Sequence, residues 1–434
     1  MRTETSAAPL VILRFGFGLM MLLSIVRFWA YGWIDKLYLQ PTFFFSYRYF
    51  EWVRPLGGWT YVLFAVVAAA AACIMVGYRH RAATLVFFLG FTYIELMDKT
   101  TYLNHYYFVS LLALLLFFLP VPGGLAAARG LRVDRKYVRA LQLFVAVVYF
   151  YAGLAKLNSD WLLHAQPLAI WLPARYDVPL LGDLLQQRWV HFAFAWGGML
   201  YDLAIPFLLW YRRTRVVAFA LVVVFHVLTR VLFPIGMFPY IMIVSALVFF
   251  DPAVHDRLLE FLSRLTGGAR PTNAAGRTAQ SDWRLLPVAA LLLFHLVFPF
   301  RHLLQTGELF WTENGYRFSW RVMLMEKAGL ATFRVEDAAG DRRAVVDNRE
   351  FLTVFQEKQM SAQPDFILEF GHYLADHYRA LGWREPRVYV DSYVALNGRL
   401  SQRYVDPEVD LTRVPRGTPP SRYLRPFQDT IYGF

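Results

Sequence analysis

Residues 148-VYFYAGLAKLNSDWL-162 begin as the apolar end of a membrane helix and finish in polar and aromatic residues typical of a membrane–water interface. One amine, Lys156, lies where hydrocarbon gives way to that interface. Removing an ammonium from water is costly, so we expect the pKa of Lys156 to fall and the neutral amine to act as a base. The alternative is a lysine that extends to the lipid headgroups, with Trp161 as an interfacial belt residue.

The composition of the 434-residue chain places that stretch in a multi-pass membrane protein. Hydrophobic residues make up 57% of the chain and aromatic residues 18%, whereas only 18% are charged. Soluble domains rarely have this combination. The net charge of +12 comes largely from arginines in short loops between apolar runs, which indicates membrane topology and argues against nucleic-acid binding.

Cys73 is the single cysteine, so an intrachain disulfide is excluded and no thiol–metal cluster is expected. The run after MRTETSAAPL is too long for a signal-peptide core, so no cleaved signal is expected.

Hydrophobic runs of sufficient length predict about nine membrane-spanning helices before the pattern changes near residue 304. The seventh and eighth are separated only by 233-FPIGMFPY-240, a joint rich in Pro and Gly that predicts a tight turn or a re-entrant break. The predicted spans lie near 10–31, 59–77, 82–97, 105–120, 139–157, 190–210, 215–233, 235–250 and 285–300.

Arginine and lysine predict the orientation of the bundle, because short cytoplasmic loops carry an excess of both. These residues concentrate after the second, fourth, sixth and eighth predicted spans. The N-terminus and these loops are therefore expected in the cytoplasm, and everything after the ninth span is expected outside it. We divide the chain accordingly into a transmembrane helical catalytic domain, residues 1–303, and an extracytoplasmic β-rich domain, residues 304–434. A cytoplasmic linker is expected at about 251–284.

Segments of alternating polar and apolar residues predict a different fold for the C-terminal domain. Gly340-Asp341 and Asn397-Gly398 are typical of hairpin turns. The predicted fold class is a polytopic α-helical membrane protein with a C-terminal extracytoplasmic α+β or β-sandwich-like domain. Strands are expected at 316–324, 331–337, 386–396 and 399–405, and helices at 348–358 and 364–382.

Ionisable and amide side chains from several predicted helices map to the extracytoplasmic half of the membrane. Such convergence at one depth is typical of a functional cavity. The alternative is that each side chain merely completes a helix end, as Asn104 would do as an N-cap. The residues are Asp98, Lys99, Asn104, His105, Lys156, Gly236, Met237 and Tyr240.

Other intramembrane polar residues leave their chemistry open. His226 and His295 lie within predicted spans and could ligate haem, although single membrane histidines more often bond to a neighbouring helix. Asp202 and Arg27 could serve packing or the cavity. The aromatic stretch 42-TFFFSYRYFEW-52 predicts an interfacial hairpin or helix, or a lid over the cavity. The sequence contains no HExxH, CxxC, GxSxG or phosphate-loop motif, so metalloprotease, thiol-redox, serine-hydrolase and nucleotide functions have no support.

Five stretches of the chain resemble the vitamin K-dependent γ-glutamyl carboxylases and their bacterial relatives. In the bundle, the family's AG-x-x-KL-x-x-DW is similar to 152-AGLAKLNSDW-161, its DKT…NH element to 98-DKTTYLNH-105, and its LF-x-IGMF-x-Y to 232-LFPIGMFPY-240. In the outer domain, 311-WTENGYRFSWRVM-323 and 385-EPRVYVDSYVALNGRLSQRYVDPEVD-410 also resemble family segments. The chain is therefore identified as a member of this family.

The resemblance implies a membrane enzyme that uses reduced vitamin K (a menaquinol or other naphthoquinol), O2 and CO2 to carboxylate glutamate side chains of a peptide or protein. Lys156 aligns with the family's catalytic base, His105 with a catalytic histidine, and Asn104 with its neighbour at the quinone site. The implied mechanism lets oxygen convert the quinol anion into a strong base, which removes a γ-proton before the carbanion captures CO2. No metal and no nucleic acid are expected, and the lipid bilayer, in a bacterial inner membrane, is the other partner. Quinol contacts are expected at Asn104, Met237, Phe238 and Tyr240, supported by Asp98, Asp160 and Trp161.

Departures from the family pattern leave the acceptor open. Ala155 replaces the first lysine of a pair in the family, while Lys156 retains the second. Animal members carry a disulfide that a chain with Cys73 alone cannot form, and the additional outer-domain material that binds a propeptide is expected to be missing here. Two alternatives therefore remain. One is a quinol epoxidase that acts on a different acceptor, and the other is a non-catalytic membrane protein of the same fold that handles an exported peptide.

Overall fold

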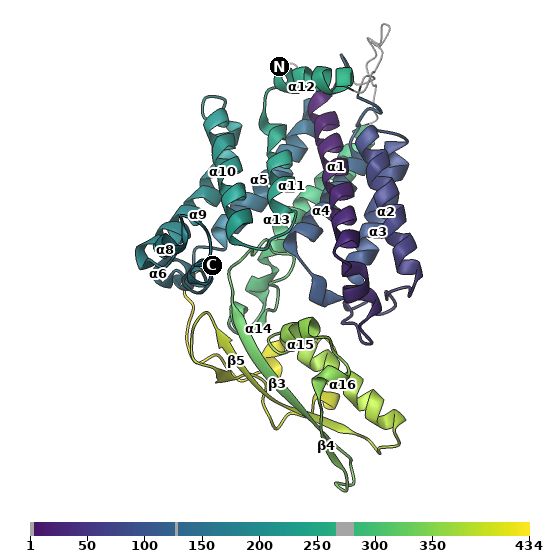
Figure 1. The fold of residues 1–434 in the computed structure, drawn as a ribbon, viewed down its shortest axis with the longest axis vertical. Helices are drawn as coiled ribbons and strands as arrows, with labels where there is room; N and C mark the ends of the chain where they lie inside the picture. Colours follow the sequence, from purple (N-terminus) through teal and green to yellow (C-terminus); the bar gives the residue numbers. More distant parts are fainter. Residues whose placement is uncertain (1–3, 126–128, 266–281) are drawn as a thin grey trace.

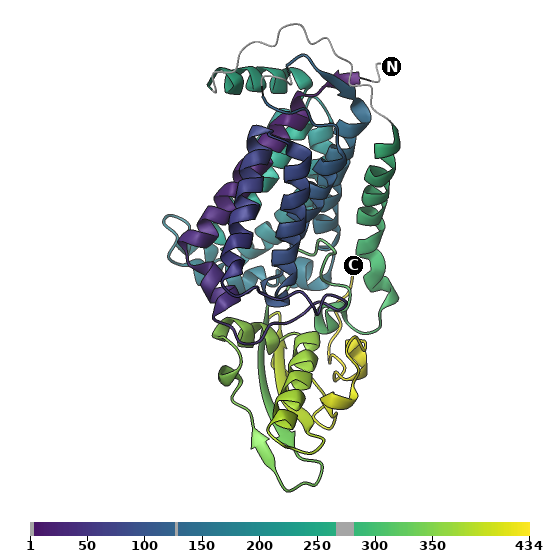
Figure 2. The ribbon, with the colours of Figure 1, turned by 90° about the vertical axis from the view of Figure 1, so that its right-hand side faces the viewer.

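The helices of the first three hundred residues or so form an elongated bundle, and the C-terminal residues form a smaller domain at one end of it (Figure 1). The computed structural model describes residues 4–125, 129–265 and 282–434. The N-terminus lies at the end of the bundle farthest from the C-terminal domain, and a view turned by 90° has the same arrangement (Figure 2). The chain returns from the C-terminal domain to the bundle, so that residue 434 lies near the junction of the two.

Each of the nine predicted spans contains a helix of the bundle. Six helical segments in the described residues are long and apolar enough to cross a membrane: α1, α2, α5, α9, α10 and residues 285–304, which begin with α13. Helices α4 and α11 are apolar but shorter. The protein is therefore a helical membrane protein, and the count of nine spans and their orientation stay predictions. The bounds are α1 (Ala8–Ala30), α2 (Trp59–Val76), α3 (His80–Leu96), α4 (Asn104–Phe118), α5 (Arg135–Leu154), α9 (Arg188–Trp210), α10 (Arg215–Leu232), α11 (Phe238–Ala246) and α13 (Leu285–Val297).

Gly153 allows α5 to pack closely against α9. A Cβ atom at this position would lie 2.8 Å from the backbone nitrogen of Leu203 on α9, so only glycine fits without a shift. Small residues at helix contacts are the usual means by which membrane helices approach one another. Because Lys156 follows Gly153 by one turn and Asp202 precedes Leu203, this contact brings a lysine and an aspartate together.

Short elements close the end of the bundle near the N-terminus. Strand β1 (Glu4–Ser6) pairs antiparallel with β2 (Arg132–Asp134), and α12 (Pro252–Leu265) lies across this end (Figure 1). Helix α12 occupies the first part of the predicted linker at 251–284. Most of the remainder of that predicted linker lies outside the described residues.

At the opposite end, short helices connect α5 to α9 and adjoin the outer domain. They are α6 (Ser159–His164), α7 (Leu168–Trp171) and α8 (Gly182–Leu185). The predicted hairpin or helix at 42–52 is wrong, because this described stretch contains only turns and irregular backbone. Two of its aromatic side chains pack against the outer domain: Phe45 stacks on Phe366 with ring centroids 4.7 Å apart, and Phe43 lies 4.5 Å from Tyr373. Tyr49, Phe50 and Trp52 remain exposed.

The outer domain is an α+β fold with one four-stranded antiparallel sheet in the order β4-β3-β5-β6. The strands are β3 (Lys327–Glu336), β4 (Arg343–Val345), β5 (Arg387–Leu396) and β6 (Gln402–Arg403). Helices α15 (Val354–Met360) and α16 (Pro364–Ala380) pack beside it, with Phe370 of α16 against Phe333 of β3 at 5.1 Å. Residues 304–434 are all described and contain no second sheet, so the β-sandwich alternative is wrong. The expected turns are present, with positive φ angles at Gly340, Asn397 and Gly398.

The predicted strand at 316–324 is absent, because the backbone there turns repeatedly. Phe318, Trp320 and Met323 have left-handed φ angles of 61°, 58° and 55°, which bulky residues seldom adopt. Their side chains are held by the bundle: the Trp320 ring stacks on Tyr107 of α4 at 5.1 Å. The alternation that suggested a strand therefore comes from a segment whose aromatic side chains anchor it beneath the membrane helices.

Candidate functional site

Lys156 lies in the turn that follows α5, and its side chain points back toward α9. Its Nζ donates to Asp202 Oδ2 at 2.8 Å and to the carbonyl of Ala152 at 3.0 Å. The two charged residues are only 6% and 5% exposed. The Trp161 ring centroid lies 5.2 Å from Nζ, and its Nε1 donates to the carbonyl of Ala195 at 2.6 Å, which fixes the ring. This burial excludes the alternative of a lysine extended to the lipid headgroups.

Asp202 is the partner that sequence reasoning did not assign to Lys156. A carboxylate at 2.8 Å stabilises an ammonium and so opposes the neutral amine expected from burial alone. The pair as a whole has no net charge whether its proton lies on Nζ or on Oδ2, so it avoids a lone buried charge. The sequence marked both residues as intramembrane charges, and opposite charges in neighbouring membrane helices usually pair, but the pairing itself depends on how α5 packs against α9.

A partly enclosed cavity of about 90 Å³ lies beside Lys156, between α5, α9, α10 and α11. We call it the lysine cavity. Its wall is mainly aliphatic and aromatic, and Met323 of the outer segment completes it. An apolar cavity with a few convergent polar groups is the usual form of a small-molecule site. The polar side chains in the wall, besides Trp161, are Tyr149, Lys156, Asp202, His226 and Thr229.

His226 on α10 contributes a second polar pair to the lysine cavity. Its Nε2 lies 2.9 Å from the hydroxyl of Tyr149 on α5. This is the bond to a neighbouring helix that a single membrane histidine usually makes. His295 lies elsewhere, stacked on Phe144 at 4.6 Å, and is not in the cavity wall. The two histidines therefore do not face each other as a pair of haem ligands would.

Of the four predicted quinol contacts, Phe238 alone lies in the wall of the lysine cavity. Its ring lies 5.6 Å from the His226 ring and 5.9 Å from the His105 ring. Met237 precedes α11 and does not line the cavity, and Tyr240 is 43% exposed on the surface of the bundle. The structure thus brings Phe238 and Lys156 together and leaves Met237 and Tyr240 outside.

His105 is buried at the start of α4, next to Phe238 but not in the cavity wall. Its Nε2 would lie 3.8 Å from a Cβ atom at Gly236, and the Arg27 guanidinium would lie 3.1 Å from the same point. The left-handed Gly236, with φ of 63°, lets the joint before α11 pass between these side chains. Arg27 is therefore a neighbour of His105 and not of Lys156.

The remaining predicted residues join the bundle to the outer domain. The Asn104 side chain donates to the carbonyl of Arg321 at 3.1 Å. Asp98 accepts from Gln356 Nε2 at 2.9 Å. Asp160 accepts two hydrogen bonds of 2.7 Å from the Arg399 guanidinium. These contacts hold the two domains together, and none of the three residues lines the lysine cavity.

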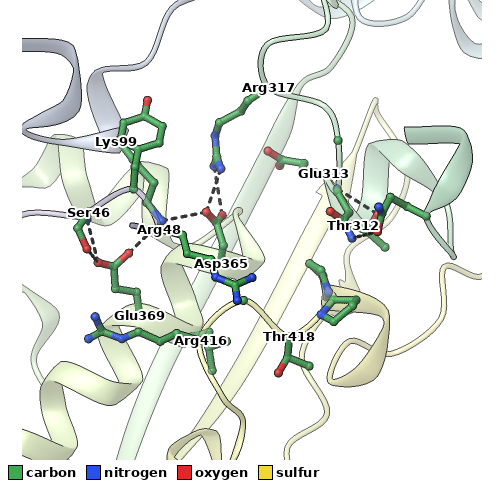
Figure 3. Close-up of a pocket in the computed structure, with 18 of the residues that line it drawn as sticks. Ser46, Arg48, Lys99, Thr312, Glu313, Arg317, Asp365, Glu369, Arg416 and Thr418 are labelled. Carbon is green, nitrogen blue, oxygen red and sulfur yellow. Dashed lines mark hydrogen bonds and ion pairs between the residues drawn. The ribbon is translucent and has the colours of Figure 1, made fainter. Parts of the chain in front are cut away.

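A second, larger cavity of about 500 Å³ lies between the rim of the bundle and the outer domain (Figure 3). We call it the polar chamber. Figure 3 shows charged side chains of both domains pointing toward one another in it. Asp365 accepts from Lys99 Nζ at 3.0 Å and from Arg317 Nη1 at 2.9 Å, and Glu369 accepts from Lys99 at 2.9 Å. The sequence placed Lys99 at the rim but gave no sign of this chamber, which depends on contacts between distant segments.

Three acids of the polar chamber are neutralised by cationic neighbours, whereas three of its arginines pair with no acid in the described part of the chain. Burial alone would raise the pKa of Asp365, but Arg317 and Lys99 outweigh it and hold that pKa well below the ordinary value of 3.8. Two of these, Arg48 and Arg416, are exposed in the chamber wall beside the exposed carboxylate of Glu51, and neither forms an ion pair with a side chain of the described residues. The chamber therefore offers two guanidinium groups to an anionic ligand.

Residues 317–323 separate the polar chamber from the lysine cavity. Phe318 lines the chamber, and Met323 lines the cavity. Trp320, between them, is fully buried against the bundle. Backbone strain of the kind found here is concentrated at functional sites in proteins. A ligand in the chamber is thus divided from a ligand in the cavity by a few residues of chain.

The helical bundle, the apolar cavity with its buried ion pair and the outer α+β domain define a polytopic membrane protein with an extracytoplasmic domain. Residues 2–253 match the HTTM domain family, and residues 280–430 match the family described as vitamin K-dependent gamma-carboxylase, lumenal domain. The chain belongs to the HTTM-domain proteins of the vitamin K-dependent γ-glutamyl carboxylase family, as predicted, and is a carboxylase-like enzyme. No solved structure matches the chain.

Proposed function

We propose that the protein uses reduced vitamin K or a related naphthoquinol, together with O2 and CO2, to carboxylate glutamate side chains of a peptide or protein. The quinone would leave as its epoxide. The observation that carries this proposal is the Lys156–Asp202 pair, two buried charges 2.8 Å apart in the wall of an otherwise apolar cavity. Intramembrane charges are costly and usually functional.

The lysine cavity suits an aromatic head group. The thioethers of Met242 and Met323 give its wall flexibility, because methionine side chains adapt easily. When bound, a naphthoquinol supplies, together with oxygen, the strong base that an unactivated γ-carbon requires. Lys156 Nζ and the Tyr149 hydroxyl supply polar groups to such a ring. The flat apolar walls come from Trp161, Phe194, Phe225, Phe233 and Phe238.

Asp202 allows Lys156 to become a neutral amine without a change in the net charge of the pair. If the shared proton moves from Nζ to Oδ2, over a separation of 2.8 Å, the ammonium–carboxylate pair becomes an amine and a carboxylic acid. The amine can then accept a proton from a hydroxyl in the cavity. The fixed ring of Trp161 and the exclusion of water keep that amine from being protonated by solvent.

His105 is proposed as the second catalytic residue, acting from the other side of Phe238. It is buried beside the Arg27 guanidinium, in a position to hold an oxyanion or to return a proton. Phe238 contacts His105 and lines the lysine cavity, so His105 would act on a ligand there only once this side chain has rotated aside.

The polar chamber is proposed to receive the glutamate-containing acceptor. Guanidinium groups bind carboxylates with paired hydrogen bonds, and Arg48 and Arg416 are available for such a contact. The acceptor glutamate would reach the lysine cavity past residues 317–323. CO2 needs no charged site, because it is small and apolar.

The proposal is tested by supplying the protein in nanodiscs with reduced vitamin K, bicarbonate and a glutamate peptide, and by measuring epoxide and carboxylated product separately. Formation of both products is expected. Arg48→Ala and Arg416→Ala should raise the KM for the peptide and leave the KM for the quinol unchanged. A matched control is Lys136→Ala, whose side chain is 65% exposed at the other end of the bundle. Epoxide without carboxylated product would mean a different acceptor, and no epoxide with any naphthoquinol would contradict the proposal.

A further inference from the structure

Residues 431–434 lie directly against the turn that carries Lys156. The backbone N–H of Ser159 donates to the carbonyl of Tyr432 at 2.7 Å, and the backbone N–H of Phe434 donates to the carbonyl of Leu157 at 2.9 Å. The Ser159 hydroxyl accepts a third bond, from the N–H of Tyr432, at 3.0 Å. A short antiparallel bridge therefore joins residues 157–159 to residues 432–434, which are more than 270 positions away in the chain.

Gly433 makes this bridge possible. Its φ of +115° lies in the region that side-chain-bearing residues rarely adopt, and a Cβ there would lie 2.2 Å from the carbonyl oxygen of Leu157. It would also lie 2.7 Å from the Cα of Asn158. Both obstacles are backbone atoms, so neither can rotate away. Only glycine permits the two segments to approach this closely.

The same segment also contacts the residue that holds Asn104. Arg321 Nη1 donates to the carbonyl of Phe434 at 3.3 Å, and the guanidinium lies 5.3 Å from the Phe434 ring. The backbone carbonyl of Arg321 in turn accepts from the Asn104 side chain at 3.1 Å. Residues 431–434 thus contact both the turn of Lys156 and the residue that ties the start of α4 to the outer domain.

We propose that residues 431–434 are a positioning strap that holds the Lys156 turn in its buried, ion-paired geometry. The catalytic meaning of this inference rests on the proposed role of Lys156 as a base, whereas the mechanical claim does not. The strap forms three hydrogen bonds with residues 157–159, which immediately follow the lysine. Without them, the turn keeps its backbone hydrogen bonds to α5, but residues 157–159 are released from the outer domain, so the approach of Nζ to Asp202 and to the cavity becomes less fixed.

Gly433→Val tests the strap, because its side chain collides with the Leu157 carbonyl. The matched control is Tyr432→Ala, which removes a side chain that is 72% exposed and leaves every backbone bond of the strap in place. The first readout is the rate at which an amine-reactive reagent labels Lys156 in nanodiscs, followed by mass spectrometry without turnover. Labelling is expected to rise about tenfold or more in Gly433→Val and to stay at the wild-type rate in Tyr432→Ala.

The second readout is the kinetics of quinol oxidation. Gly433→Val is expected to lower kcat about tenfold or more with little change in the KM for the quinol, because none of residues 431–434 lines the lysine cavity. Ser159→Ala, which removes one of the three bonds, should have a smaller effect in the same direction and serves if Gly433→Val does not fold. Wild-type labelling of Lys156 in both variants would overturn the strap. Faster labelling in a protein whose wild type makes no epoxide would support the strap and contradict the proposed function.

Discussion

Replacement of either member of the Lys156–Asp202 pair should destabilise the protein, and replacement of both should restore most of the loss. The side chains are each 7% exposed and 2.8 Å apart. Asp202→Leu leaves a buried ammonium without a partner, and Lys156→Met leaves a buried carboxylate, at an expected cost of about 3–5 kcal/mol each. The loss of stability in each single variant has an upper limit, because the unpaired group can lose its charge instead. At pH 7 this neutralisation requires only about 4–5 kcal/mol. The double variant contains no unpaired buried charge, and its free energy of unfolding is expected within about 2 kcal/mol of the wild-type value.

The assay is reversible unfolding of the purified protein in mixed micelles at pH 7, with the free energy of unfolding measured for wild type, both single variants and the double variant. The matched control is Lys136→Met, because Lys136 is 65% exposed and 3.9 Å from Asp134. This exposed pair should contribute less than about 1 kcal/mol. If the two single-variant losses simply add in the double variant, the two charges do not depend on each other and the ion pair does not stabilise the fold.

His105→Ala is expected to lower quinol turnover by about 100-fold or more, the usual contribution of a general acid–base group, and turnover equal to wild type would make His105 a packing residue. Leu400→Cys in a Cys73→Ala background should react with an impermeant thiol reagent added outside intact cells, because Leu400 is 90% exposed in the outer domain; protection there would reverse the predicted orientation. Asp365→Asn is expected to destabilise the outer domain by about 1–2 kcal/mol at neutral pH, a modest value because the Asp365 side chain is 37% exposed. Since its cationic neighbours hold the pKa of Asp365 below 3.8, the wild type should lose this contribution as the pH falls below about 4, and the variant should lack this part of the acid dependence in thermal unfolding.

The helices of the bundle could be predicted from the sequence because a membrane helix must satisfy its backbone within itself and expose apolar side chains along its whole length. The predicted span at 59–77, for example, is α2 over Trp59–Val76. The short joint predicted at 233–240 was also identified from local signals, since Pro and Gly interrupt a helix, although α11 already begins at Phe238. Local rules failed at 316–324, where aromatic side chains anchored in the bundle override an alternating pattern.

The sequence predicted only those site residues whose chemistry is unusual for their place in the chain. Lys156 was found because an amine in an apolar run is unusual, and its burial agrees with that expectation. Its partner Asp202 was recognised as an intramembrane charge, but the pairing depends on how α5 packs against α9. Tyr240 resembled a cavity residue by its place in a motif, yet the first turn of α11 directs it to the surface. The polar chamber and the strap join segments far apart in the chain, so no local sequence pattern could predict them.

The role of Lys156 as the base is tested by the rate of epoxide formation by Lys156→Ala in nanodiscs, at saturating quinol and with folding verified by the unfolding midpoint. If the buried amine is the group that activates the quinol, the variant should form no epoxide above background while the wild type forms it continuously. Epoxide formation at the wild-type rate in that variant would contradict the account, because no other amine lines the lysine cavity in the described part of the chain.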